Sequence, residues 1–117
     1  MKFIQLILMA WALCVPVLAS STEVEASDAG ATVYRTGDYK QAQALWLGAL
    51  EGLEGQPGKE RQVGQLCYNL GNAAYRAGES MQAIAWYTAA RKHMPRDADL
   101  LANLKFVRGE LALPPEH

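Results

Sequence analysis

Few residues of this chain could carry out chemistry, and their spacing does not assemble a catalytic or metal site. His93 and His117 lack metal-ligand spacing to Cys67 or to any carboxylate. Serine and histidine are too sparse for a nucleophilic triad, and the glycines at 52, 55 and 58 are not followed by the Lys-Ser/Thr of a phosphate-binding loop. His93 is expected in the last turn of a helix, where a cation is mildly favoured. We therefore expect a protein that is not an enzyme and that uses no cofactor and no metal.

Cys67 is the only cysteine that remains if the first 19 residues are removed, because the other cysteine is Cys14. A single cysteine cannot form an internal disulfide. It is either a reactive thiol that bridges to another chain or a small apolar residue buried between helices. We expect the buried role, since Cys67 falls where two helices would pack.

The elements that must position any site are helices, and residues 67–95 show this best. Gly78 suits the left-handed conformation in which many helices end. Ser80 or Glu79 can cap the helix that follows, and Pro95 stops it. Two helices joined by a tight turn are therefore predicted in this stretch.

The small and aromatic residues of this stretch resemble the tetratricopeptide repeat (TPR) pattern, a helix–turn–helix unit of about 34 residues. Gly71 and Ala83 are small enough to let two antiparallel helices approach closely. The positions that match are Cys67, Leu70, Gly71, Ala83, Tyr87, Ala90 and Pro95. The resemblance implies an all-α fold, in which two TPR helix–turn–helix pairs and a capping helix form a short right-handed solenoid.

A second copy of the pattern lies 41 residues upstream. Its recurring residues are Gly30, Tyr34, Arg35, Gly37, Gln41, Ala42, Ala44 and Ala49, and their counterparts are Gly71, Tyr75, Arg76, Gly78, Gln82, Ala83, Ala85 and Ala90. The offset exceeds the usual repeat length, which predicts an inserted loop at residues 51–58, where three glycines and a proline occur.

These units predict the domain organisation. A TPR domain spans residues 27–111, after a signal peptide at 1–19 and a flexible leader at 20–26, and before a tail at 112–117. Its first repeat covers about 27–50, with helices at about 28–35 and 39–50 and Asp38 as a cap. Its second repeat covers about 59–95. Asp97 caps a closing helix within 97–111, which shields the apolar face of the last repeat, as the ends of stacked arrays require.

Two longer segments sharpen the resemblance. YNLGNAAYRAG (residues 68–78) and AIAWYTAARKHMPRDADLLANLKFVR (residues 83–108) are similar to the TPR segment of the bacterial aerotolerance-operon (Bat-type) proteins. The match covers residues 67–108. It implies a role in envelope or oxidative-stress tolerance.

In TPR arrays the first helix of each pair lines a concave surface, and this surface is the expected binding site. Its six expected partner-binding residues are Tyr68, Asn72, Tyr75, Arg76, Asn103 and Phe106, joined by Tyr34 and Arg35 from the first repeat. Amides can bond the backbone of an extended peptide, and a guanidinium can pair with a carboxylate. The packing pattern requires neither Asn72 nor Arg76, so both are expected to contact a ligand. For Tyr34 and Tyr75 the alternative is a packing role.

Residues 1–19 have the layout of a secretory signal peptide. Lys2 precedes an apolar run from Phe3 to Leu18, and modest or small residues lead up to Ala19. This predicts export to the periplasm or out of the cell, with cleavage near Ala19. The alternative is an uncleaved anchor in the inner membrane, for which the run is a little short, because a bilayer span takes about 20 residues.

Size and charge limit the possible functions. The chain has 117 residues and a formal net charge of −1, which fits one small domain and gives no charge excess toward nucleic acid or an anionic membrane surface. We expect an exported adaptor that binds a partner peptide or protein segment in its concave groove. The alternative is a structural module that is stable only within a larger membrane-associated assembly, since stability usually takes about three repeats. Oligomerisation stays open.

The signal-peptide prediction can be tested directly. Fusion of residues 1–25 to a reporter protein is expected to drive export, and the product should be trimmed near Ala19. N-terminal sequencing of the exported reporter checks the position of cleavage. An untrimmed reporter that fractionates with the membrane would instead identify the segment as an anchor.

Overall fold

The computed structural model describes residues 24–116, and these residues form helices joined by short turns. Residues 24–35 are helical, and they are followed by α2 (Tyr39–Leu53), α3 (Glu60–Arg76), α4 (Ser80–Arg91) and α5 (Ala98–Glu110). No strand occurs among the described residues, so the all-α prediction is confirmed. The expected signal peptide, most of the expected leader and His117 lie outside the described residues. Within residues 24–116, no helix combines the length and the apolar character needed to cross a membrane.

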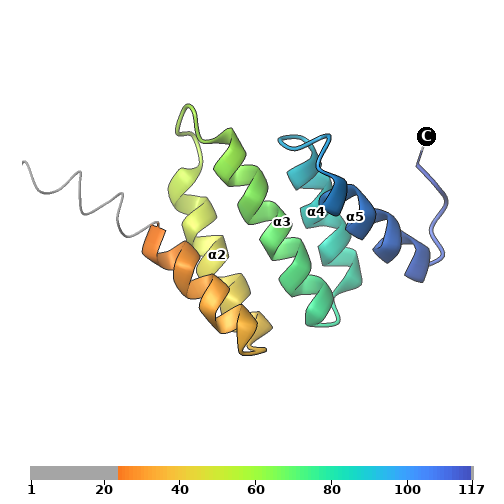
Figure 1. Cartoon of the computed structure of the whole chain (residues 1–117), viewed down its shortest axis with the longest axis horizontal. Helices are drawn as coiled ribbons and strands as arrows, with labels where there is room; N and C mark the ends of the chain where they lie inside the picture. Colours follow the sequence, from red (N-terminus) through yellow and green to blue (C-terminus); the bar gives the residue numbers. More distant parts are fainter. Residues whose placement is uncertain (1–23, 117) are drawn as a thin grey trace, which may run out of the picture.

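The helices lie in a row, each packed against the next along the chain. Helix α2 packs on α3, α3 on α4, and α4 on α5 (Figure 1). The helix at 24–35 packs on α2, where the indole nitrogen of Trp46 donates a hydrogen bond to the carbonyl oxygen of Ser27 at 3.1 Å. Helix α3 therefore lies in the middle of the row and contributes the largest share of the buried residues.

In each of the two helical pairs, an aromatic ring of the second helix lies against a glycine of the first helix. A Cβ atom placed on Gly71 of α3 would lie 2.5 Å from Cε1 of Tyr87 in α4, which is too close for any side chain. Gly30 is in the same position against the ring of Trp46 in α2. Trp46 and Tyr87 are themselves 41 residues apart. The repeat seen in the sequence is thus also a repeat of packing contacts, with Ala42 and Ala83 fully buried at equivalent points.

Three of the helices end in the same kind of turn. Gly37, Gly78 and Ala112 have φ angles of 89°, 83° and 53°. The N–H of Gly78 donates to Tyr75 O at 3.0 Å, and the N–H of the next residue donates to Ala74 O at 2.8 Å. The same two bonds close the turns at Gly37 and Ala112, and this pattern is the Schellman motif. Alanine lacks glycine's freedom at positive φ, which is why the sequence did not predict the third turn.

Several element boundaries differ from those predicted. Helix α2 runs on to Leu53, which is buried, so the connecting loop covers residues 54–59 in place of 51–58. Residues 24–26, expected in the flexible leader, are helical. Helix α4 ends at Arg91, well before Pro95, and the exposed His93 lies in a turn beyond the helix. That turn closes over Gly64 of α3, where an added Cβ would lie 2.8 Å from His93 Cβ.

The predicted caps are partly confirmed. Asp38 accepts a hydrogen bond from the backbone N–H of Gln41 at the start of α2, and Asp97 does the same for Leu100 at the start of α5. Glu79 precedes α4 but makes no side-chain cap. Its carboxylate instead pairs with Lys40 of α2 at 2.7 Å and accepts a hydrogen bond from another α2 side chain. This side chain therefore ties the start of α4 to α2.

Cys67 is buried in α3, as expected from its place at the packing face. It makes no disulfide within the described part of the chain. Burial raises the pKa of its thiol, with a smaller contribution from Glu54 in the same direction. A raised pKa lowers the fraction of reactive thiolate, so the surroundings of Cys67 fit a packing role.

The Gly71–Tyr87 contact leads to a stability prediction with a control in the same fold. We expect Gly71→Ala to lower the free energy of unfolding by about 1–3 kcal/mol, because the buried Tyr87 ring cannot move away from the added methyl group. Gly48→Ala in α2 is the control, since nothing lies within 4 Å of its added Cβ. There the same change should raise stability by up to about 1 kcal/mol through helix propensity. Chemical denaturation of the two variants checks this, and equal effects would contradict the proposed packing.

Candidate functional site

The residues predicted to bind a partner lie together around one hollow of about 300 Å³. Its walls come from the helix at 24–35, from α3 and from α5, with Tyr87 of α4 behind them. The lining residues are Tyr34, Asn72, Tyr75, Arg76, Tyr87, Asn103, Phe106 and Val107. Five of the six predicted residues are among them, and the sixth, Tyr68, is hydrogen-bonded to one of them. Tyr34 joins the site as expected, whereas Arg35 is exposed and does not line the hollow.

An amide pair forms the centre of the site. The side-chain nitrogen of Asn103 in α5 donates to Asn72 Oδ1 and to Tyr68 Oη in α3, both at 3.2 Å. Asn72 Oδ1 also accepts a hydrogen bond of 2.6 Å from the hydroxyl of Tyr87. These bonds join α3, α4 and α5 at one point. Asn72 belongs to the second predicted repeat and Asn103 to the predicted closing helix, and the fold brings their side chains into contact.

The role expected for Asn72 changes in view of these contacts. The Tyr87 side chain is only 1% exposed, and burial raises the pKa of its hydroxyl. A buried hydroxyl that loses its partner destabilises the fold, so Asn72 is a structural acceptor as well as a surface group. Asn72 was expected to contact a ligand, and the structure adds a hydrogen bond within the fold to that expected role. Its partner is Tyr87, whose ring lies against Gly71 and whose hydroxyl group reaches the hollow.

Arg76 is exposed at the end of α3 and is held by an aromatic pair. Its Nε and Nη2 atoms donate to the hydroxyl of Tyr39 at 3.2 and 3.0 Å. The guanidinium carbon lies 5.4 Å from the centre of the Tyr39 ring. Tyr39 in turn packs edge-on against Tyr34, with ring centres 5.3 Å apart. The cation is thus fixed in direction, and its Nη1 side is not used in these bonds.

Tyr75 and Phe106 make the other wall. The Tyr75 hydroxyl donates to Glu110 Oε1 at 3.0 Å, and the hydrogen bond to this carboxylate raises the pKa of Tyr75. The rings of Tyr75 and Phe106 meet edge to face, with centres 6.0 Å apart. Phe106 is nevertheless 57% exposed. Tyr34 and Tyr75 therefore both pack against neighbours, as their alternative role required, while Phe106 offers an open apolar face.

The amide pair leaves hydrogen-bonding groups that its internal bonds do not use. Asn72 keeps its amide N–H groups, and Asn103 keeps its side-chain oxygen, since neither is used in the bonds made by the described residues. A donor and an acceptor side by side match the C=O and N–H of one extended backbone unit. Arg76 adds a cation at one end of the hollow, and Phe106 adds an apolar surface.

Sequence reasoning missed Tyr39 and Glu110. Tyr39 starts α2 and was counted only as a helix residue, although it directs Arg76. Glu110 stands 34 residues after Arg76, at the equivalent last position of the next first helix. Extending the repeat alignment by that offset would have placed Glu110 at the last position of the closing helix, but it would not have identified Tyr75 as its partner. No such pattern identifies Tyr39, because its contact with Arg76 crosses from one repeat to the next.

No protein-family model matches the chain, and the search of curated proteins finds no match. Among residues 24–116, no group of three or more His, Cys, Asp or Glu side chains is placed to hold a metal ion.

A double-mutant cycle tests the structural role of Asn72. We expect Asn72→Ala to lower the free energy of unfolding by about 1–3 kcal/mol, because the Tyr87 hydroxyl loses its acceptor. In a Tyr87→Phe background the same replacement should cost clearly less, since no hydroxyl is left unpaired. Asn69→Ala, which removes only an exposed bond with Gln65, is the control. Equal costs in both backgrounds would mean that the Asn72–Tyr87 bond contributes nothing.

Proposed function

We propose that this chain is an exported adaptor of the tetratricopeptide type, which binds an extended segment of a partner protein in the hollow between its first helices. The single observation that carries the proposal is the convergence of Asn72, Arg76, Asn103 and Phe106 on that hollow from two separate helices. The proposed right-handed solenoid and the concave groove belong to this proposal.

The fold supports this proposal because its packing contacts and its turns repeat along the chain. The Gly30–Trp46 and Gly71–Tyr87 contacts recur at the 41-residue offset. The turns at Gly78 and Ala112 recur at 34 residues, which matches the repeat length of about 34 in TPR proteins. Stacked units of this kind present their first helices along one surface. Here those helices are residues 24–35, α3 and α5.

The chemistry of the surface supports a peptide as the ligand. A protein segment in extended form presents alternating C=O and N–H groups, and the Asn72–Asn103 pair keeps one donor and one acceptor for them. An apolar side chain of the segment would pack on Phe106, and a carboxylate would pair with the free side of Arg76. The segment is bound through backbone and side chains together, with no chemical change.

The location and biological role are part of the same proposal. Residues 1–19 support export, with the periplasm as the compartment if the source is a bacterium with two membranes. The resemblance of residues 67–108 to the aerotolerance-operon proteins supports a role in envelope or oxidative-stress tolerance. Contact with a membrane would come only through an uncleaved leader or through the partner.

Site-specific photo-crosslinking tests whether the hollow is the binding surface. Phe106 and Met81 are 57% and 61% exposed, but Phe106 lies at the hollow and Met81 lies on α4, away from it. A photoreactive phenylalanine derivative at position 106 is expected to capture a discrete partner from envelope extract. The same group at position 81 should not. Capture is measured by gel shift and mass spectrometry of the crosslinked products. Equal capture at both positions would rule out the hollow as the binding surface.

A second candidate function is that of a structural module within a larger assembly. It is favoured by helix α5, whose backbone lies against α4, and by the exposed side chains of Leu101 and Leu111 in and just after this helix. Sedimentation of the chain without residues 1–19 separates the candidates. A folded monomer agrees with the adaptor, and an obligate oligomer agrees with the assembly module.

A further inference from the structure

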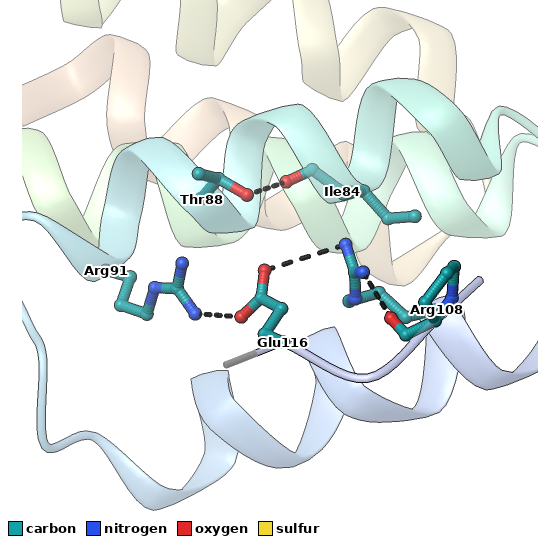
Figure 2. Close-up of polar contacts among 6 residues, drawn as sticks. Ile84, Thr88, Arg91, Arg108 and Glu116 are labelled. Carbon is teal, nitrogen blue, oxygen red and sulfur yellow. Dashed lines mark hydrogen bonds and ion pairs between the residues drawn. The ribbon is translucent and has the colours of Figure 1, made fainter.

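A short segment after α5 crosses back over the helices. After the turn at Ala112, residues 113–116, which we call the strap, run between α4 and α5. The carboxylate of Glu116 pairs with Arg91 of α4 and lies 3.6 Å from Nη1 of Arg108 in α5. Arg108 also donates from Nη2 to the carbonyl oxygen of Pro114 at 2.6 Å. Figure 2 shows Glu116 between the two guanidinium groups.

The strap forms one wall of a groove of about 430 Å³, which residues 113–116 line together with residues of α4 and α5. Leu101 and Leu104 of α5 give it an apolar side, and Arg91, Lys105 and Arg108 give it three cations. It shares no lining residue with the hollow between the first helices. The strap groove is therefore a second surface, on the other side of α5, which the proposed function does not use.

The charge of this groove is not balanced by the strap. One carboxylate, that of Glu116, faces three basic side chains. Lys105 makes no ion pair with any residue in the part of the chain that the structure describes. An occupant with two or more carboxylates would match the groove better than the strap does.

The strap is held by side chains that are partly exposed, among them Arg108 at 22%. The Arg91 and Glu116 side chains are each 36% exposed, and ion pairs between such groups are individually weak. Arg91 keeps the pKa of Glu116 below its usual value, with a smaller contribution from Arg108, so the carboxylate stays charged near neutral pH. Glu116 is thus a charged ligand of the arginine pair, and a carboxylate from another segment can compete with it.

We propose that the groove between α4 and α5 is a docking site for an acidic, proline-containing segment of a partner protein, and that Glu116 of the strap occupies the arginine pair of this site in the unbound chain. Arg91 and Arg108 hold one carboxylate of that segment, and Lys105 holds another. The apolar residues beside the carboxylates pack on Leu101 and Leu104. The strap competes with the partner segment within the same molecule, which reduces the apparent affinity without blocking the site.

The sequence of the strap supplies the probe. A fluorescent peptide with three copies of Leu-Pro-Pro-Glu and capped ends presents several carboxylates in the context seen in the structure. Its binding is measured by fluorescence anisotropy to the full chain, in its original form and as Glu116→Gln. The variant is expected to bind about tenfold more tightly, because the apparent dissociation constant scales inversely with the fraction of molecules whose site is open.

Charge-matched variants identify the surface. In the Glu116→Gln chain, Arg91→Gln together with Arg108→Gln should weaken binding by about tenfold or more, since two charge-assisted hydrogen-bonding groups are lost. Lys92→Gln is the control, because this exposed neighbour of Arg91 does not line the groove. A peptide with Gln in place of each Glu should not bind. Circular dichroism checks that all variants keep their helices.

Four outcomes would overturn the proposal. These are no binding to the Glu116→Gln chain, equal binding with and without Glu116, equal effects of Lys92→Gln and the arginine pair, and self-association of the Glu116→Gln chain in sedimentation. The last would assign the groove to contacts between copies of this chain. None of these outcomes bears on the Phe106 crosslinking result, because the two surfaces share no residue.

Discussion

The close approach of α3 and α4 at Gly71 is the contact on which most of the structure depends. Only a residue without a side chain lets the Tyr87 ring lie against the α3 backbone. The ring is buried there, and its hydroxyl emerges on the far side to reach Asn72. One side chain thus fills the core and fixes a polar group at the surface. In the first pair Trp46 does the same against Gly30, and its indole nitrogen reaches Ser27 O.

This contact couples stability to the candidate site. Asn72 accepts from both Tyr87 and Asn103, so the surface amides are held by a side chain of the core. No buried side-chain nitrogen or oxygen lacks a partner in the described part of the chain. The groups left for a ligand are those that the internal bonds do not use. A binding surface fixed in advance loses less conformational entropy when it binds.

Helix α5 separates two surfaces of different character. On one side Asn103, Phe106 and Glu110 complete the hollow between the first helices, where aromatic and amide groups dominate. On the other side Lys105 and Arg108 face the strap, where cations dominate. The last helix of the row therefore belongs to both proposed sites.

The sequence by itself determined the all-α class, the two-fold repeat, the caps at Asp38 and Asp97, and the residues gathered at the hollow, because glycine, alanine and aromatic residues at helical spacing leave few ways to pack. Only the tertiary structure decided the contacts that cross between repeats. It showed that Tyr39 directs Arg76, that Glu110 accepts from Tyr75, and that Glu116 returns to Arg91. It also changed Asn72 from an expected free contact into a structural acceptor. Local spacing fixes which side of a helix a residue occupies, but the partner that a long side chain reaches depends on how neighbouring helices are placed in space.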